Sequence, residues 1–208
     1  MRAWLTQHFA HPAGAWGRVA GHVMATRPSN RRRNEWTVDL LDLQAGQRVL
    51  EVGFGPGLSL FKAMAKVGEA GFVAGIDTSD VMLAQATRRN IWAIQRGRMT
   101  LHVAGAEALP DLGGPFDAIL AVNSIGFWRD RHACLQELLK RLAPGGRLAI
   151  TEQPRSKGAT AETSAEIRTE LEQNLRDAAF DSVESHVLAL DPPAVCVIGS
   201  AKGDGAGP

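Results

Sequence analysis

A glycine-rich turn between a buried strand and a helix constrains this chain more than any other feature. Residues 48–52 read as a short strand, glycines follow at positions 53, 55 and 57, and an apolar helix start comes next. Glycine lets the backbone turn sharply and lets a ligand approach without an intervening Cβ. The N-terminus of the following helix presents unpaired N–H groups to whatever lies in the turn. The pattern predicts a nucleotide-binding turn in an α/β protein.

The spacing of the glycines separates this turn from the dinucleotide-binding type. That fingerprint is G-x-G-x-x-G, whose last glycine allows close helix packing. Here the third glycine comes one residue earlier, Pro56 stiffens the loop, and Glu51 lies two residues before the first glycine. An NAD-dependent oxidoreductase stays an alternative, because such enzymes share a glycine turn and an acid at the end of the next strand.

Downstream of the turn, strand and helix patterns alternate, which is typical of a mostly parallel sheet with helices on both faces. The expected strands span residues 48–52, 72–76, 99–103, 116–122, 147–151, 182–190 and 195–199. The expected helices span residues 29–43, 58–67, 79–96, 130–142 and 163–179. The last two strands are joined by Asp191-Pro192-Pro193, which is too short for a helical crossover and predicts an antiparallel pair.

Composition narrows the class of protein. The 208 residues suit one domain, and a net charge of +1 gives no general signature of polyanion binding. Cys134 and Cys196 lie far apart in apolar segments, so we expect two buried free thiols, no metal site and a cytoplasmic protein. No stretch approaches the roughly 20 apolar residues of a membrane span.

Five blocks, in order along the chain, resemble the class I S-adenosylmethionine-dependent methyltransferases, and most closely those of ubiquinone and menaquinone biosynthesis. The blocks are Val49 to Gly57, Gly75-Ile76-Asp77, Ala106 to Pro110, Phe116-Asp117-Ala118 and Leu142 to Leu148. The resemblance covers about residues 35–200. It implies a Rossmann-like sheet of seven strands, mostly parallel, with an antiparallel seventh strand beside the sixth.

The resemblance also implies a division of the single domain, residues 1–208. Residues 1–34 would form an N-terminal helical lid, residues 35–200 the Rossmann-like core, and residues 201–208 a flexible tail. Residues Arg31 to Arg33 form a short basic run that we expect to be a solvated helix start. An anionic substrate or a membrane surface is the alternative partner for this run, so peripheral membrane contact stays open.

Several residues are candidates for binding S-adenosylmethionine. Asp77 ends the second strand, twenty residues beyond Gly57, where a carboxylate can accept both hydroxyls of a ribose. The resemblance puts Thr78 and Met82 beside the adenine, although Met82 also fits the apolar core. Glu51 is expected to contact the cofactor's amino group.

The segment Gly105-Ala106-Glu107 departs from the family pattern. The family often has Asp at the first of these positions, hydrogen-bonding the adenine amino group. Gly105 lacks that side chain, a loss of about 1 kcal/mol. The Ala106 backbone N–H can still meet the adenine ring, and Glu107 is a possible substitute for the missing acid.

Residues after the fourth strand are candidates for the cofactor's methionine part and for the acceptor pocket. By resemblance Asn123 lies near the methionine part, and Ser124, Phe127 and Trp128 begin the acceptor pocket, with Trp16 closing from the N-terminal segment. For Trp16 and Trp128, core packing is an equal alternative. The segment does not match the Asn-Pro-Pro-Tyr motif of nucleic-acid amino-methyltransferases, so a nucleic acid substrate is not expected.

No catalytic residue is evident. The sulfonium of S-adenosylmethionine is already activated, so the main task is to hold an acceptor atom in line with the methyl carbon and exclude water. His11 and His132 are weak candidates for a general base. The sequence thus predicts methyl transfer to an O, N or C atom of a small, partly apolar molecule. A non-catalytic cofactor-binding or partner module is an alternative, and the oligomeric state is not predicted.

Overall fold

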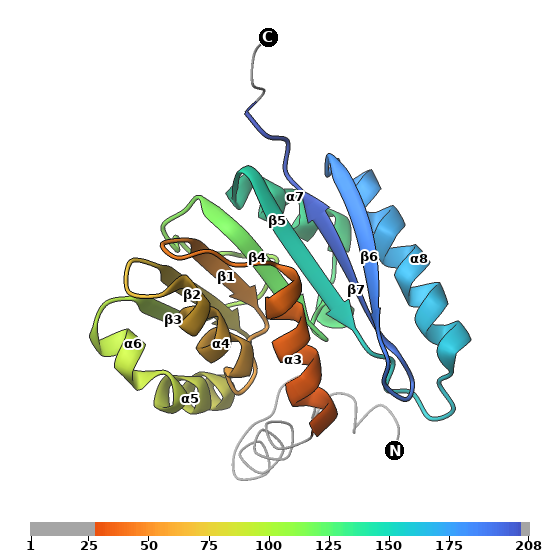
Figure 1. Cartoon of the computed structure of the whole chain (residues 1–208), viewed down its shortest axis with the longest axis horizontal. Helices are drawn as coiled ribbons and strands as arrows, with labels where there is room; N and C mark the ends of the chain where they lie inside the picture. Colours follow the sequence, from red (N-terminus) through yellow and green to blue (C-terminus); the bar gives the residue numbers. More distant parts are fainter. Residues whose placement is uncertain (1–27, 205–208) are drawn as a thin grey trace.

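The computed structural model describes residues 28–204, which form an open twisted sheet with helices on both faces (Figure 1). The strands are β1 (Arg48–Val52), β2 (Phe72–Asp77), β3 (Met99–Val103), β4 (Phe116–Val122), β5 (Leu142–Glu152), β6 (Ser182–Leu188) and β7 (Ala194–Ser200). The helices are α3 (Pro28–Leu40), α4 (Leu58–Val67), α5 (Asp80–Arg89), α6 (Ile91–Gln95), α7 (Arg131–Arg141) and α8 (Ala161–Asp177), with a 3-10 turn η1 (Ile125–Phe127).

The strand order is β3-β2-β1-β4-β5-β7-β6, so β7 lies between β5 and β6 and runs antiparallel to both. The other neighbouring pairs are parallel. This arrangement confirms the predicted seven-stranded sheet with an antiparallel seventh strand. The order reverses between β1 and β4, and ligands bind open α/β sheets at the carboxyl ends of the strands beside such a reversal.

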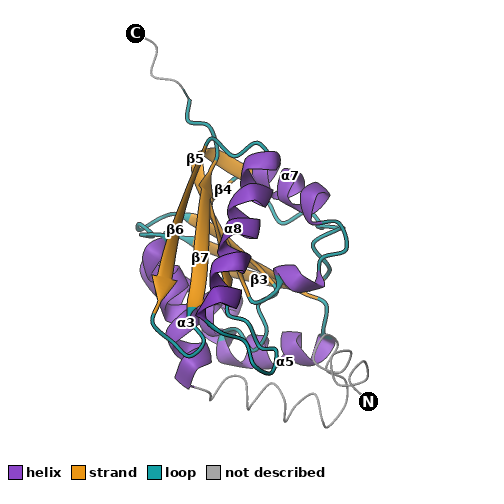
Figure 2. Ribbon diagram, turned by 90° about the vertical axis from the view of Figure 1, so that its right-hand side faces the viewer, coloured by secondary structure: helices purple, strands orange, loops and turns teal. Residues whose placement is uncertain are grey.

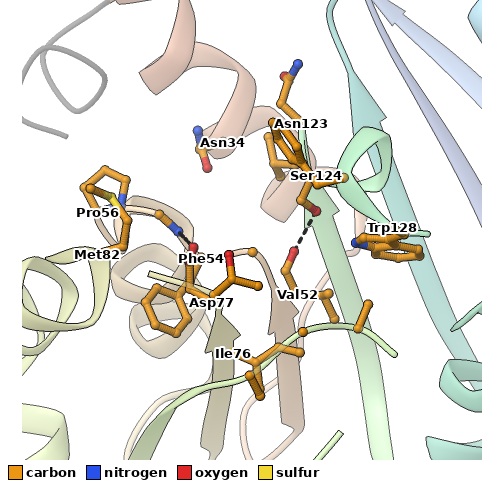
Figure 3. A pocket seen from close by; sticks show the side chains of 18 of the residues that line it. Asn34, Val52, Phe54, Pro56, Ile76, Asp77, Met82, Asn123, Ser124 and Trp128 are labelled. Atoms are coloured by element: carbon orange, nitrogen blue, oxygen red, sulfur yellow. Dashed lines mark hydrogen bonds between the residues drawn. The ribbon is translucent and has the colours of Figure 1, made fainter. Parts of the chain in front are cut away.

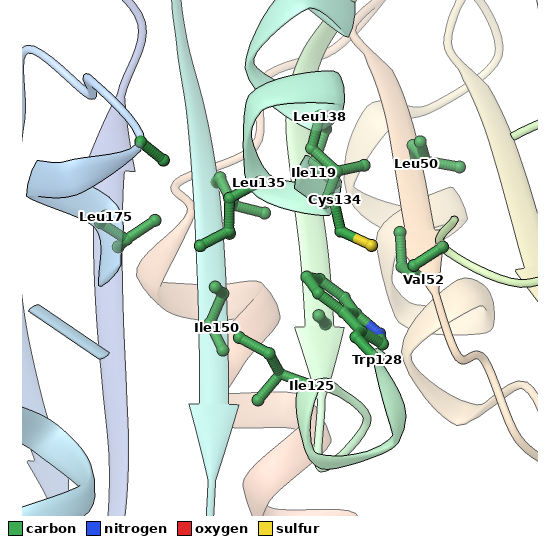
Figure 4. Close-up of a cluster of buried hydrophobic side chains, with 14 of the residues drawn as sticks. Leu50, Val52, Ile119, Ile125, Trp128, Cys134, Leu135, Leu138, Ile150 and Leu175 are labelled. Carbon is green, nitrogen blue, oxygen red and sulfur yellow. The ribbon is translucent and has the colours of Figure 1, made fainter. Parts of the chain in front are cut away.

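Side chains of the sheet alternate between two buried apolar layers. In β1, Leu50 and Val52 join the layer under α7 and α8, whereas Val49 joins the layer under α3 to α6. Figure 2 shows the sheet from its side with helices against both faces, and Figure 4 shows part of the α7–α8 layer. Cys134 and Cys196 are buried free thiols, as expected.

Two expected elements differ in the structure. The helix predicted over residues 79–96 is two helices broken at Asn90, whose amide donates to the carbonyls of Ala86 and Gly57 and so ends α5. Strand β5 starts at Leu142 rather than Arg147, since the register against β4 shifts between Phe116 and Ala118 and keeps the intervening turn inside the strand.

The start of the described chain also differs from expectation. Helix α3 spans Pro28–Leu40, so it starts one residue before the expected helix over residues 29–43 and ends three residues earlier. Arg33 is only 2% exposed, which makes the expected solvated basic run wrong at that residue. Residues 1–27 of the predicted lid, with His11 and Trp16, lie outside the described residues. Within the described part of the chain, every helix is too short or too polar to span a membrane.

Candidate functional site

A cavity of about 290 Å³ opens at the carboxyl ends of β1, β2 and β4, where the sheet topology places a ligand site. Its walls come from segments far apart in the sequence. We call one part the glycine-turn end, formed by Gly53 to Pro56, Asp77, Thr78, Met82 and Gly105 to Glu107. The other part, the β5 end, is formed by Asn30, Asn34, Asn123, Ser124, Phe127, Trp128 and Arg155. Figure 3 shows the two sets of side chains facing the same space.

The glycine turn is held by backbone contacts that require glycine. Gly53, Gly55 and Gly57 have φ angles of 81°, 50° and 77°, which side-chain-bearing residues rarely adopt. A Cβ on Gly53 would lie 2.5 Å from Cβ of Ser124. A Cβ on Gly57 would lie 2.9 Å from Cβ of Ala86. Gly57 is absent from the cavity wall, so it serves the close packing of α4 on α5, whereas Gly53 and Gly55 face the cavity.

Asp77 joins the turn to β2. Its Oδ2 accepts a hydrogen bond from the Gly55 backbone N–H at 2.7 Å, and its Oδ1 accepts one from Ser79 N–H at 2.9 Å. The carboxylate lies in the cavity wall and points to the bend rather than away from it (Figure 3). Each carboxylate oxygen can accept a further hydrogen bond, so the geometry fits a ligand that carries a vicinal diol.

Thr78 and Met82 lie beside Asp77 in the wall. Thr78 is exposed, and Met82 is 2% exposed and packs in the α3–α6 layer. Met82 therefore has both of the roles that the sequence left open: it is core and cavity wall at once.

The segment after β3 also lines the cavity. Glu107 folds back so that its Oε2 lies 2.8 Å from where a Cβ on Gly105 would be. Its Oε1 accepts a hydrogen bond from the Arg129 backbone N–H at 2.7 Å. The space that a side chain at position 105 would enter is thus occupied by the carboxylate of Glu107, with Ala106 buried between them.

Glu51 lies behind the cavity rather than in its wall. The side chain is 1% exposed and is bonded to the Ser59 hydroxyl, which also contacts Asn34 Oδ1 at 2.9 Å. Burial raises the pKa of Glu51 to about 8, the Ser59 hydrogen bond opposes this, and the charge of Asp77 adds to it. The structure therefore gives no direct contact between Glu51 and the cavity, in contrast to our expectation.

At the β5 end, the segment after β4 contributes four wall residues. Asn123 has a φ of 52°, and the Ser124 hydroxyl donates to the Val52 carbonyl at 2.7 Å, which ties this segment to β1. Phe127 is 58% exposed, whereas Trp128 is 8% exposed and packs beside Cys134 in the α7–α8 layer (Figure 4). Trp128 is thus mainly core, and Phe127 is the aromatic side chain that a bound molecule meets.

His132 does not belong to the site. It is exposed on α7 and absent from the cavity wall. A general base must reach the acceptor in the cavity, so the prediction for His132 is wrong. His11 and Trp16 lie outside the described residues.

Three polar wall residues were missed by the sequence analysis: Asn30 and Asn34 on α3, and Arg155 after β5. Two of them are held by hydrogen bonds within α3: Arg33 Nη2 donates to Asn30 Oδ1 at 2.6 Å, and Asn34 Nδ2 donates to the Asn30 carbonyl at 2.7 Å. A buried network continues from Arg33. Arg33 donates to Gln153 Oε1 and Gln153 Nε2 donates to the Pro192 carbonyl, while Thr37 and Thr151 share a hydrogen bond of 2.6 Å. The polar run Ser29 to Asn34 was the available signal. It reads as a helix start because nothing local shows that it meets residues 120 positions away.

Comparison with known proteins agrees with this geometry. Residues 49–146 match the family described as "Methyltransferase domain". An uncharacterized methyltransferase, YdaC of Bacillus subtilis, is 30% identical over 86% of this chain and 95% of its own length. The ubiquinone/menaquinone biosynthesis C-methyltransferase UbiE of Cronobacter sakazakii is 33% identical over 59% of this chain and 49% of its own length, so only about half of that relative is spanned.

Solved structures support the fold. A SAM-dependent methyltransferase from Aquifex aeolicus superposes with a TM-score of 0.69 at 23% identity, over 86% of this chain and 97% of the other. These matches favour a methyltransferase over both an NAD-dependent oxidoreductase and a non-catalytic module. From the glycine turn, the strand-end acid and these relatives together, the chain belongs to the class I S-adenosylmethionine-dependent methyltransferases.

Proposed function

We propose that this enzyme transfers the methyl group of S-adenosylmethionine to an O, N or C atom of a small, partly apolar acceptor. One observation supports this above all: the Asp77 carboxylate, bonded to the glycine turn, lies in the same cavity as the polar and aromatic wall after β4. A single cavity thus offers, at one part, an acid that can bind a diol and, at the other, a surface of polar and apolar side chains for the acceptor.

The residues of the glycine-turn end fit the cofactor. Asp77 would accept the two ribose hydroxyls, while Gly53 and Gly55 let the ligand approach the backbone. Met82 and Thr78 would flank the adenine, the Ala106 N–H would meet the ring, and Glu107 would accept from the adenine amino group. S-adenosylmethionine supplies a methyl carbon already activated by the sulfonium.

The residues of the β5 end would hold the acceptor. Phe127 and Trp128 supply apolar surface, while Asn30, Asn34 and Arg155 supply polar groups around it. What these side chains do is orient an acceptor atom toward the methyl carbon and exclude water from the line of transfer. Glu51 would act at a distance, by fixing Ser59, whose hydroxyl bonds to the wall residue Asn34.

The relatives suggest a broad choice of acceptors. They include a C-methyltransferase of ubiquinone and menaquinone biosynthesis, an aklanonic acid methyltransferase of Streptomyces and a nocamycin O-methyltransferase of Saccharothrix syringae. Their names state methylation of an acid, methylation at oxygen and methylation at carbon in quinone biosynthesis. A partly apolar molecule with a hydroxyl or carboxyl group is therefore the first acceptor class to test.

The test is an acceptor screen with isotope-labelled S-adenosylmethionine, run beside calorimetric titration of S-adenosylhomocysteine. We expect micromolar binding of S-adenosylhomocysteine and label transfer to at least one phenol, acid or amine, with both reduced in Asp77→Ala. An absence of heat and of any thermal shift at millimolar ligand would overturn the proposal. Binding without transfer to any compound would favour the non-catalytic module.

A membrane-borne acceptor is the second candidate. The observation that favours it is the pair of exposed arginines near the start of α3, Arg31 and Arg32, whereas Arg33 is buried. The N-terminal segment that would join them at a membrane lies outside the described residues. Co-sedimentation of the full chain with anionic vesicles tests it, and Arg31→Glu with Arg32→Glu is the matched variant. Lack of co-sedimentation would leave a soluble acceptor.

A further inference from the structure

Two polar side chains meet where β4 and β5 end. Val122 pairs with Thr151 in the register of these parallel strands, and the Asn123 backbone N–H continues the ladder to the Thr151 carbonyl at 2.7 Å. Asn123 and Glu152 are thereby placed side by side at the carboxyl edge of the sheet. Asn123 lies in the cavity wall, and Glu152 lies directly behind it.

The hydrogen bonds of Asn123 fix which way its amide faces. Nδ2 donates to the Gln153 carbonyl at 3.0 Å and to Glu152 Oε2 at 3.3 Å. This leaves Oδ1 as the free end of the amide. Within residues 28–204, Asn123 Oδ1 and Glu152 Oε1 are both buried acceptors without a hydrogen-bond partner. Buried acceptors are normally paired, and an orphaned pair next to a cavity indicates a donor that arrives with a ligand.

The backbone at this point supports the same reading. Asn123 adopts a φ of 52°, in the left-handed region that non-glycine residues seldom occupy and that concentrates at functional sites. The frame around it is rigid, because Gln153 is anchored on one side by Arg33 and on the other by the Pro192 carbonyl. These hydrogen bonds fix the orientation of the Asn123 amide in the structure.

Charged groups face Glu152 from three elements: Arg33 on α3, Arg155 after β5 and Arg131 on α7. Burial nevertheless outweighs them and raises the pKa of Glu152 to about 7, against the opposing effects of these arginines and of the Ile125 backbone N–H. The carboxyl thus changes its charge in the neutral range, where most carboxylates are fully ionised.

We propose that Asn123 Oδ1, in an amide held by Glu152, forms a subsite that accepts a hydrogen bond from an ammonium, amine or hydroxyl group of a molecule in the cavity, and that this oxygen is available only when Glu152 is ionised. When Glu152 is protonated, its hydroxyl can donate a hydrogen bond to Asn123 Oδ1. That oxygen is then no longer available to accept a hydrogen bond from the ligand. Glu152 is a positioning residue, because it acts through Asn123. The inference rests on the proposed function, and the donor group belongs either to the amino-acid part of the cofactor or to the methyl acceptor.

The experiment compares the pH dependence of binding in the wild type and in Glu152→Gln. The ligands are S-adenosylhomocysteine and 5′-methylthioadenosine, which lacks the amino-acid part. The exposed Glu166→Gln on α8 serves as the matched control. With a pKa near 7, the ionised fraction rises about tenfold between pH 6 and pH 8, and apparent affinity follows the competent fraction.

If the donor belongs to the cofactor, S-adenosylhomocysteine binds the wild type and the control about tenfold more tightly at pH 8 than at pH 6. The change is absent for 5′-methylthioadenosine and is lost in Glu152→Gln. Any contribution of Glu51, which titrates in the same range, remains in Glu152→Gln and is thereby separated. If the donor belongs to the acceptor, both nucleosides bind independently of pH, and KM for the acceptor found in the screen carries the tenfold change at constant kcat.

Three results would be decisive against the inference. A pH dependence of binding that is as large in Glu152→Gln as in the wild type overturns it. So does a binding affinity that does not change with pH, if the acceptor KM is equally independent of pH or no transfer is found. A wild type that binds no S-adenosylhomocysteine at any pH overturns the proposed function as well, which distinguishes the two failures. Should Glu152→Gln not fold, Asn123→Gly keeps the backbone geometry, removes Oδ1 and is expected to lose the same pH dependence.

Discussion

The two parts of the cavity are built in different ways. At the glycine-turn end, the Asp77 carboxylate is held by two backbone N–H groups, those of Gly55 and Ser79, from the two loops that flank it. At the β5 end, Asn123 bonds to the Glu152 side chain and to the Gln153 carbonyl, and Gln153 itself is held by the Arg33 side chain on α3 and by the Pro192 carbonyl of the β6–β7 turn. The first part depends on backbone N–H groups of neighbouring loops, whereas the second depends on hydrogen bonds in which side chains from distant segments take part.

This difference separates what the fold must keep from what a particular enzyme can change. A part made of main-chain contacts tolerates few substitutions, because each would alter the path of the chain. A part made of side chains can be altered one residue at a time without moving a strand. The glycine-turn end is therefore suited to a cofactor, and the β5 end to an acceptor that differs between relatives.

The largest effect is expected where the two parts touch, at Gly53. In Gly53→Ala the new Cβ would lie 2.5 Å from Cβ of Ser124, at a φ of 81°. Overpacking and the left-handed backbone together should lower the free energy of unfolding by about 3 kcal/mol. Urea denaturation measures this change.

The matched control is Gly145→Ala. Gly145 has a φ of 72° and no atom within 4 Å of its prospective Cβ, so only the backbone penalty of about 1 kcal/mol remains. Equal losses in the two variants would mean that contact between the glycine turn and Ser124 does not matter, and the two parts of the cavity would then be independent.

The next effect tests the buried acid behind the glycine-turn end. Because the pKa of Glu51 is raised to about 8, the folded protein holds more protons than the unfolded chain between the ordinary pKa of 4.5 and pH 8. Stability must therefore fall as pH rises through this window, by about 2 kcal/mol between pH 6 and pH 8 from Glu51 alone.

Glu51→Gln should remove that part of the slope, while the smaller part due to Glu152, whose pKa is about 7, should remain. Chemical denaturation of both proteins at pH 6, 7 and 8 measures the slopes. Equal slopes of stability against pH in the wild type and Glu51→Gln would show that Glu51 is not protonated in the folded protein.

The third effect concerns Asp77. Asp77→Ala removes a charged acceptor from the cavity and frees the Gly55 N–H, so binding of S-adenosylhomocysteine should weaken by about 1.5 kcal/mol or more. Asp80→Ala, an exposed acid three residues away and outside the cavity wall, is the control in the same calorimetric titration. Unchanged affinity in Asp77→Ala would mean that Asp77 does not contact the ligand, and the assignment of the glycine-turn end to the cofactor would fail.

The sequence predicted the two parts of the cavity unequally, for a physical reason. Strand ends and the glycine turn follow from hydrophobic runs and from backbone conformations that only glycine adopts easily, and both are local properties. The pairing of Asp77 with Gly55 spans 22 residues, but both lie in motifs whose order along the chain is informative.

The β5 end has no such local signature. Arg33 bonds Gln153 across 120 positions, and its burial runs against the usual exposure of a triple-arginine run. The same limit applies to Glu51: alternation in β1 turns it toward α3 and α4, but only the structure shows its hydrogen bond to Ser59, which in turn bonds to Asn34. Distant polar pairs are set by packing, which periodicity does not describe.

The smallest expected effect concerns Gly105, which stands where the family often has Asp. It tests whether the hydrogen bond of that Asp to the adenine amino group is lost or is replaced by one from Glu107. Glu107 occupies the place beside Gly105 and is fixed by the Arg129 N–H. If it accepts from the adenine amino group, Glu107→Ala should weaken S-adenosylhomocysteine binding by about 1 kcal/mol and leave S-inosylhomocysteine, which lacks that amino group, unaffected. Gly105→Asp should not improve binding, because its Cβ would lie 2.8 Å from Glu107 Oε2. If Glu107→Ala discriminates the two nucleosides as well as the wild type does, Glu107 does not replace the missing acid. If Gly105→Asp binds S-adenosylhomocysteine more tightly, this part of the cavity has lost a contact that an Asp can restore.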